Sequence, residues 1–350
     1  MLNKPPDTPP HKRRPRYPGR NPRAYSEKYK ELNPERYADD VGKVIAAGKT
    51  PAGSHRPIMV EEVLRCLDPG PGDVAVDCTL GGGGHAHTIL ERIQPGGRLI
   101  GLDVDPLELP RTEARLRAAG FGPEAFVAHH SNFAALPQIL ARERLAAADV
   151  VLADLGVSSM QLDNPERGFS YKGVGPLDMR MNPTRGEPAS RLLGRIGEAE
   201  LAALLTANSD EPHAALIAGI LKQQPVDTTH AIERLIRLGL NEALPRLAKP
   251  DVKMSIRRTL QALRIAVNDE FSVLDALLRS VPNCLAPGGR VAVITFHSGE
   301  DRRVKKAFQA GYRDGTYSGI ATEVIRSSME ETRANRRASA AKLRWAVRAG

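Results

Sequence analysis

Short apolar runs alternate with amphipathic segments along much of the chain. Five runs rich in apolar and β-branched residues predict buried strands: Val74–Val76, Arg98–Leu102, Ala125–Ala128, Asp149–Ala153 and Val291–Phe296. Apolar residues at helical spacing predict helices over Glu61–Leu67, His85–Ile93 and Leu107–Ala119. Strands that alternate with helices in this way favour an α/β fold with a mainly parallel sheet.

A long helical stretch interrupts this alternation. Between about residue 187 and residue 253 the pattern predicts four helices: Glu198–Thr206, Pro212–Lys222, Thr229–Leu238 and Asn241–Leu247. A basic helix over Met254–Asn268 and a helix over Asp269–Leu278 then lead back to the last strand. We therefore expect residues 54–163 and 254–350 to form the α/β core. Residues 164–253 are expected to form a loop plus an all-α insertion.

A glycine turn follows the first predicted strand. Asp77 ends that strand, Gly81–Gly84 form the turn, and Asp103 ends the second strand. The turn fits the dinucleotide-binding fingerprint, and an acid after the second strand is where nucleotide-binding α/β folds hold a ribose hydroxyl. This stretch alone leaves three interpretations open: a nicotinamide or flavin dehydrogenase, an S-adenosylmethionine (AdoMet) methyltransferase, and a purely structural turn.

The loop after the fourth strand decides between them. It places Asp154, Ser158, Ser159, Gln161 and Asp163 at the carboxyl end of a parallel strand, on the side where such sheets bind cofactors. An enzyme that methylates an exocyclic base amine needs acceptors here to hold the N–H groups and align the nitrogen with the methyl group. A dehydrogenase needs a proton-donating His or Tyr with a Lys or Asp partner, and no such set is evident. The loop favours a methyltransferase.

The composition indicates the class of partner. The formal net charge of +9 and the sequence pI of about 9.6 favour a polyanion such as nucleic acid. Residues 1–53 are rich in Pro, Arg and Lys, which predicts a basic, largely flexible extension that contacts phosphates or is simply a solvated tail.

Other residue types exclude some kinds of site. Three distant cysteines provide no disulfide framework and no Cys-x-x-Cys site, so we expect a reducing compartment and a cytoplasmic protein. His129 and His130 lack a third ligand at metal spacing, and no metal site is expected. No apolar run approaches the length needed to span a bilayer.

Two aromatic residues leave their role open. Phe169 and Tyr171 lie in a segment of turn formers and paired charges that predicts an ordered loop. They can stack on a flipped base, or they can fill the core of the loop.

Ten motifs in order carry a resemblance that runs from about His55 to Arg344. They are His55-Arg-Pro-Ile, Asp77-Cys-Thr-Leu-Gly-Gly-Gly-Gly-His85, Asp103-Val-Asp-Pro, Asp154-Leu-Gly-Val-Ser-Ser, Gln161-Leu-Asp, Glu166-Arg-Gly-Phe-Ser, Pro176-Leu-Asp-Met-Arg-Met, Gln261-Ala-Leu-Arg-Ile, Phe296-His-Ser and Glu300-Asp-Arg. Together they resemble the bacterial 16S rRNA cytosine-N4 methyltransferase family known as RsmH, formerly MraW.

The resemblance implies a Rossmann-like class I core, AdoMet as cofactor, and a helical insertion that helps form the RNA-binding cleft. The implied reaction is methylation of N4 of a decoding-centre cytidine (position 1402) in 16S rRNA of the small ribosomal subunit. Carried over by motif, the cofactor contacts are Gly83, Gly84, His85, Asp103, Phe133, Asp154 and Gln161. We expect catalytic contacts from Asp154, Ser158 and Ser159, and substrate contacts from Phe169, Arg180, Arg264 and His297.

The chain departs from the family pattern outside the cofactor motifs. Gly299 replaces a Leu, Leu260 replaces a Phe, Asn208-Ser-Asp-Glu211 replaces Tyr-Gly-Glu-Glu, and Asn335-Arg-Arg-Ala-Ser339-Ala replaces Asn-Pro-Arg-x-Arg-Ser. These departures concern RNA docking, so two alternatives stay open: a methyltransferase on a different RNA or DNA cytosine, and a catalytically silent ribosome-assembly factor. The sequence does not fix the oligomeric state.

Overall fold

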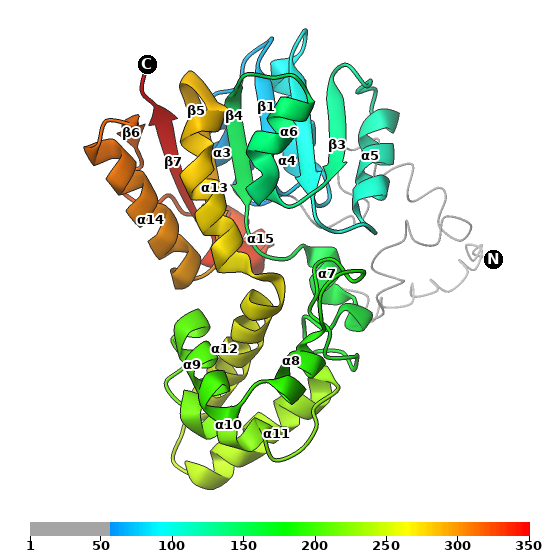
Figure 1. Ribbon diagram of the computed structural model, residues 1–350, viewed down its shortest axis with the longest axis vertical. Coiled ribbons are helices and arrows are strands. Elements are labelled where there is room, and N and C mark those ends of the chain that lie inside the picture. Colours follow the sequence, from blue (N-terminus) through cyan, green and yellow to red (C-terminus); the bar gives the residue numbers. More distant parts are fainter. Residues whose placement is uncertain (1–56) are drawn as a thin grey trace, which may run out of the picture. The chain divides into compact units, whose positions relative to one another are not determined.

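The structure is a computed structural model, and it describes residues 57–350 (Figure 1). The predicted basic extension over residues 1–53 and the motif residues His55 and Arg56 lie outside the described residues. Within the described part of the chain the strands form one seven-stranded sheet in the order β3-β2-β1-β4-β5-β7-β6. The predicted α/β fold is confirmed.

Five of the strands are parallel and two are not. The parallel strands are β1 (Val74–Asp77), β2 (Arg98–Asp103), β3 (Phe126–His130), β4 (Ala148–Asp154) and β5 (Leu285–Thr295). They correspond to the five predicted strands. β7 (Lys342–Arg348) pairs antiparallel with β5, and β6 (Tyr317–Ile320) pairs antiparallel with β7. These last two strands were not predicted, because β7 interleaves Lys and Arg with its apolar residues.

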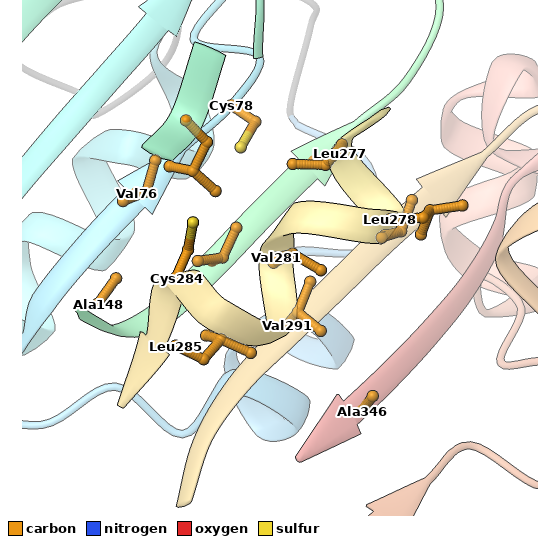
Figure 2. Close-up of a cluster of buried hydrophobic side chains, with 14 of the residues drawn as sticks. Val76, Cys78, Ala148, Leu277, Leu278, Val281, Cys284, Leu285, Val291 and Ala346 are labelled. Carbon is orange, nitrogen blue, oxygen red and sulfur yellow. The ribbon is translucent and has the colours of Figure 1, made fainter. Parts of the chain in front are cut away.

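Helices cover both faces of the sheet because successive strand residues point to opposite sides. On one face, α3 (Val60–Leu67), α4 (Gly84–Ile93) and α5 (Leu109–Ala118) pack on residues such as Ala75 and Leu99. On the other face, α6 (Leu136–Arg142), α13 (Glu270–Cys284) and α14 (Ser298–Arg313) pack on their neighbours Val76 and Ile100. Figure 2 shows Leu277 and Val281 of α13 within this second cluster.

A separate hydrophobic core, apart from the two faces of the sheet, is formed by the part of the chain between β4 and β5. After the short elements α7 (Ser159–Asp163) and η3 (Pro165–Arg167), this segment contains α8 (Ala189–Arg195), α9 (Glu198–Ser209), α10 (Ala214–Leu221), α11 (Thr229–Ala243) and α12 (Lys249–Asn268). Their buried residues form one cluster, which includes Leu205, Ile217 and Leu263. Figure 1 shows these helices gathered beyond the end of the sheet at which β4 leads into α7. The expected all-α insertion is present.

One continuous helix, α12, crosses the expected end of the insertion. The predicted return to the core at Met254 falls inside α12, and the buried residues of α12 belong to the helical cluster. The chain instead turns at Asp269, whose φ of 51° ends α12 and begins α13. The sequence becomes more basic at Met254, but the apolar face of α12 continues unbroken past this residue.

The last part of the chain returns to the sheet. Between β6 and β7 lie α15 (Met329–Ala334) and η4 (Arg336–Ala340). Over residues 57–350, no helix combines the length and apolar character that crossing a membrane requires.

Candidate functional site

Acidic side chains meet at one edge of the sheet. Asp77, Asp103 and Asp154 are the last residues of β1, β2 and β4, which are adjacent and parallel. Their carboxyl ends therefore lie side by side, as in α/β folds that bind a ligand where the strand order reverses. β5 ends beside them, and His297 follows two residues after its last residue.

The glycine turn lies against this edge and is held there by hydrogen bonds. The N–H of Gly81 donates to Oδ2 of Asp103 at 2.7 Å, and the hydroxyl of Thr112 in α5 donates to the carbonyl of Gly81. Gly83 has a φ of 72°, and a Cβ on it would lie 2.7 Å from Cγ2 of Thr112. A Cβ on Gly84 would lie 2.5 Å from Cγ of Pro57. Both glycines are needed for packing, and their predicted contact with a cofactor stays a prediction.

Asp103 keeps acceptor capacity for a ligand. Its Oδ1 accepts the N–H of Asp105 at 2.8 Å, and its Oδ2 accepts the N–H of Gly81. A carboxylate has about four acceptor positions, so at least one remains. Burial raises the pKa of Asp103, against the lowering effect of the N–H groups of Asp105, Gly81 and Val104.

His85 lies between two carboxyl groups. It is buried in the first turn of α4, with its Nε2 3.7 Å from Oδ2 of Asp154. Burial lowers the pKa of His85, but the charges of Asp154 and Asp77 outweigh burial and raise it overall. Asp77 is 1% exposed, and burial raises its pKa to about 6. Thr79 links the two acids, because its hydroxyl accepts the N–H of Asp154 at 2.7 Å and lies 3.5 Å from Oδ1 of Asp77.

The loop after Asp154 is fixed by a capping box at the start of α7. Oγ of Ser158 accepts the N–H of Gln161, and Oε1 of Gln161 accepts the N–H of Ser158. The amide nitrogen of Gln161 donates to Asp105 at 2.8 Å, and Arg167 donates to the same carboxylate oxygen at 2.7 Å. The side chain of Gln161 is thus bonded within the chain, and its cofactor contact stays a prediction.

The C-terminal segment reaches the same loop. Arg337 in η4 donates one hydrogen bond to the hydroxyl of Ser159 and another, at 3.0 Å, to Asp163. This arginine lies in one of the altered family motifs. It joins α7 to a segment more than a hundred residues away in the sequence.

A buried ion-pair cluster lies where the helical insertion meets the core. Arg264 of α12 makes two hydrogen bonds of 2.8 Å to Glu270 of α13, and Glu300 of α14 lies 4.0 Å away. Burial lowers the pKa of Arg264, but the charge of Glu270 outweighs burial and raises it. For Glu300, burial raises the pKa, whereas His297 and Arg264 lower it more.

His297 caps α14 within this cluster. Its Nδ1 accepts the N–H of Glu300 at 3.4 Å. Its Nε2 lies 3.1 Å from Oε1 of Glu300 but makes no hydrogen bond there. The replacement of Leu by Gly299 has a local reason, because a Cβ at Gly299 would lie 2.7 Å from Cζ of Phe271. The predicted contacts of Arg264 and His297 with the substrate stay predictions.

Phe169 is a candidate that the structure buries. It is 7% exposed and belongs to the hydrophobic core of the helical insertion. This burial favours the core-filling alternative, and the predicted contact of Phe169 with the substrate stays a prediction. Arg180 is paired with Asp178 through hydrogen bonds of 2.8 and 2.7 Å. Phe133 in η2 is half-buried beside the cluster that contains α6 and α13. The assigned roles of Arg180 and Phe133 stay predictions.

Several organising residues were missed by sequence reasoning: Asp77, Asp105, Arg167, Glu270 and Arg337. All but Glu270 lie inside motifs that the sequence analysis quoted. Their neighbourhood in a motif was the only available signal, because their partners come from other elements.

The site fits a cofactor that carries a ribose and a positive charge. Oδ1 of Asp154 and Nε2 of His85 are buried without hydrogen-bond partners, and Asp103 has free acceptor capacity. Three carboxyl groups, those of Asp77, Asp103 and Asp154, end adjacent strands here, which suits a cationic ligand. Among the described residues no cluster of His, Cys, Asp and Glu could hold a metal ion.

Comparison with known proteins adds independent information. A family model described as the MraW methylase family matches residues 52–349. The chain is 48% identical to ribosomal RNA small subunit methyltransferase H 2 of Alkaliphilus metalliredigens, covering 96% of this chain and 97% of that protein. It is 47% identical to ribosomal RNA small subunit methyltransferase H 1 of Lachnoclostridium phytofermentans, covering 97% of this chain and 94% of the relative. Among solved structures, an rRNA methylase described as putative from Clostridium thermocellum aligns with a TM-score of 0.40 and 10% identity, over 83% of this chain and 93% of that chain.

Proposed function

The chain belongs to the MraW methylase family, and from this premise we propose that it transfers a methyl group to N4 of the decoding-centre cytidine in 16S rRNA of the small ribosomal subunit. Its class follows from the family and the named relatives: it is an AdoMet-dependent rRNA methyltransferase. What we propose beyond this class is the nucleotide, the decoding-centre cytidine, and the atom that is methylated, N4.

The observation that carries the proposal is the position of Asp154. It ends β4 beside Asp77 on the acidic edge, and its Oδ1 is buried without a hydrogen-bond partner. An exocyclic amine offers two N–H groups, and its lone pair is delocalised into the ring. A fixed carboxylate that accepts a hydrogen bond from the amine orients the nitrogen. It also stabilises the positive charge that develops on the nitrogen as the bond to carbon forms.

The residues of the acidic edge also suit the cofactor. Asp103 would bind ribose hydroxyls with its remaining acceptor capacity, and the glycine turn lets the backbone approach closely. When bound, AdoMet supplies a methyl group on a positively charged sulfur. Asp154 and Asp77 provide negative charge at the same edge, and α7 and the glycine turn fix the loops around it.

The direct test is methyl transfer from AdoMet to 30S subunits that lack this modification, with the product nucleoside mapped by mass spectrometry. We expect N4-methylcytidine at one decoding-centre site. Asp154→Asn should lower the rate at least about 100-fold, because Asn keeps an acceptor oxygen but loses the negative charge that stabilises the positive charge developing on nitrogen, and such a charge contributes roughly that much.

A matched control is Asp149→Asn. Asp149 lies near the opposite end of β4, where its carboxylate accepts the N–H of Val74 at 2.8 Å. This variant should keep a rate within about threefold of the unmodified chain, since the residue does not touch the acidic edge. Methylation of another nucleotide would contradict the proposed target. Binding of AdoMet without methylation of 30S subunits, free rRNA or DNA would favour the assembly-factor alternative.

A further inference from the structure

Asp77 is a buried carboxyl group whose only part in the reaction outlined above is its negative charge. It is 1% exposed, and its Oδ1 accepts the N–H of Thr79 at 3.0 Å. Thr79 in turn accepts the N–H of Asp154, and His85 completes the link, since its Nε2 lies 3.7 Å from Asp154. Asp77, His85, Thr79 and Asp154 therefore form one connected group, called here the proton network.

The surroundings of the proton network are mostly acidic. Asp103 faces Asp77 from β2, and Glu331 of α15 acts on His85 while it accepts the N–H of Met59 at 2.8 Å. Asp105, beside Asp103, forms an ion pair with Arg167, whose guanidinium nitrogen lies 2.7 Å from its Oδ2. His85 is thus the basic group of the network itself, and the carboxyl groups of Asp154, Asp77 and Glu331 raise its pKa against the effect of burial.

Methyl transfer changes the charge next to these buried carboxyl groups. The bond between sulfur and the methyl carbon breaks with its electron pair left on sulfur, so one positive charge disappears from the edge. The nitrogen forms its bond to carbon and releases one proton. Buried carboxylates that lose a neighbouring cation bind protons more tightly.

We propose that Asp77, His85 and Asp154 share the proton that the amine releases, so that a proton replaces the positive charge that the site loses on methyl transfer. The inference rests on the proposed function. Asp154, whose side chain is 26% exposed, would receive the proton on its carboxylate, and Asp77, which does not touch the substrate, shares it through His85 and Thr79. The raised pKa of Asp77, about 6 because of burial, places this exchange near neutral pH.

Ligand binding without RNA tests the proton network. S-adenosylmethionine carries the sulfur charge and S-adenosylhomocysteine does not, so the two ligands differ in the charge that matters. Isothermal titration calorimetry near pH 6.5, in two buffers of different ionisation enthalpy, gives the number of protons taken up with each ligand. We expect the protein to take up more protons when it binds S-adenosylhomocysteine than when it binds S-adenosylmethionine. The difference should be about half a proton or more, because linkage converts the charge difference into proton binding. In Asp77→Asn the difference should fall by at least about half.

Controls separate the proposal from a general loss of structure. His85→Gln is a second variant in case Asp77→Asn does not fold, and it should also reduce the difference in proton number. Asp149→Asn, on the same sheet and outside the network, should leave the difference unchanged. Equal proton numbers for the two ligands in the unmodified chain would overturn the proposal, and so would an unchanged difference in the folded network variants. Because no RNA is present, failure of the rRNA assignment would not alter this result.

Discussion

Gly83 and Thr112 form the tightest contact of the glycine turn. The left-handed φ of Gly83 and the position of Cγ2 of Thr112 both exclude a side chain, for separate reasons. The two reasons can be measured separately, since Ser lacks the methyl group of Thr but keeps the hydroxyl that bonds to Gly81.

We expect Gly83→Ala to lower the free energy of unfolding by about 2–4 kcal/mol, of which about 1–2 kcal/mol is backbone strain and the rest overlap. In a Thr112→Ser background the overlap should disappear. A double-mutant cycle from urea unfolding should then give a coupling of at least about 1 kcal/mol. Full additivity of the two substitutions would show that the methyl group is not the obstacle.

Burial of Asp77 makes stability depend on pH in an unusual direction for an acid. Its pKa is about 6 in the folded chain and about 4 when unfolded, so between these values the folded state binds more protons. Stability therefore falls as pH rises through this window.

Asp77→Asn should remove that dependence. Relative to the unmodified chain, the variant should gain stability on the order of 2–3 kcal/mol at pH 7 and little at pH 4. Thermal unfolding at both pH values measures this, and a gain that is equal at both would contradict a titrating Asp77. A stabilising substitution at a functional residue would be an instance of the trade between stability and activity.

At the residue scale, sequence reasoning placed acids correctly but could not assign their partners. Asp103 and Asp154 were found because the carboxyl ends of parallel strands meet at one edge. The pairing of Arg264 with Glu270 depends on a turn at Asp269, and the burial of Phe169 depends on helices that follow it in the sequence. Neither the turn nor that packing has a periodic signature.

The helical insertion is joined to the sheet by a buried ion pair. Asp105, after β2, accepts from Arg167 of η3, and Arg167 also donates to the carbonyls of Arg180 and Met181. One arginine thus fixes the loop that leads into the insertion. Sequence patterns gave the strands and most helices of these elements, because their apolar faces repeat at fixed spacing. The expected end of the insertion at residue 253 followed a change in charge composition, which carries no information on packing.

We expect Arg167→Met to lower the free energy of unfolding by about 3–5 kcal/mol, because it leaves the buried Asp105 carboxylate without its cation. The exposed pair of Arg195 and Glu187, at 2.7 Å, provides the control. Arg195→Met should cost much less, as the loss of an exposed pair does. Urea unfolding followed by circular dichroism compares the two, and similar costs would argue against a structural role for the buried pair.

At the scale of the whole molecule, the positive charge is concentrated in the part of the sequence before His55. Residues 1–53 contain twelve Lys and Arg against six Asp and Glu, so they carry +6 of the net +9. Arg13, Arg14 and Arg16 lie within four residues of one another. If they contact phosphates, their contribution to RNA affinity comes from released counterions.

Replacement of these three arginines by Gln should weaken binding to 16S rRNA and reduce the slope of log K against log salt by about 1–3. The corresponding Arg→Lys variant keeps the charge and should keep the slope. Affinity for AdoMet should not change in either variant. Filter binding over a range of salt concentrations measures the slope, and an unchanged slope in the Gln variant would identify the segment as a solvated tail.

The position of the helical insertion also governs how the chain reaches its native state. β4 and β5 are neighbours in the sheet, yet about 130 residues separate them in the sequence. Closing such a loop costs about 4 kcal/mol of chain entropy, but a preformed helical cluster from Phe169 to Leu263 would shorten the flexible part and recover about 1 kcal/mol. During synthesis the insertion leaves the ribosome before β5 does, so its local contacts can form first. The preformed helical cluster would then bring β5, and the strands that follow it, close to β4, with which β5 pairs.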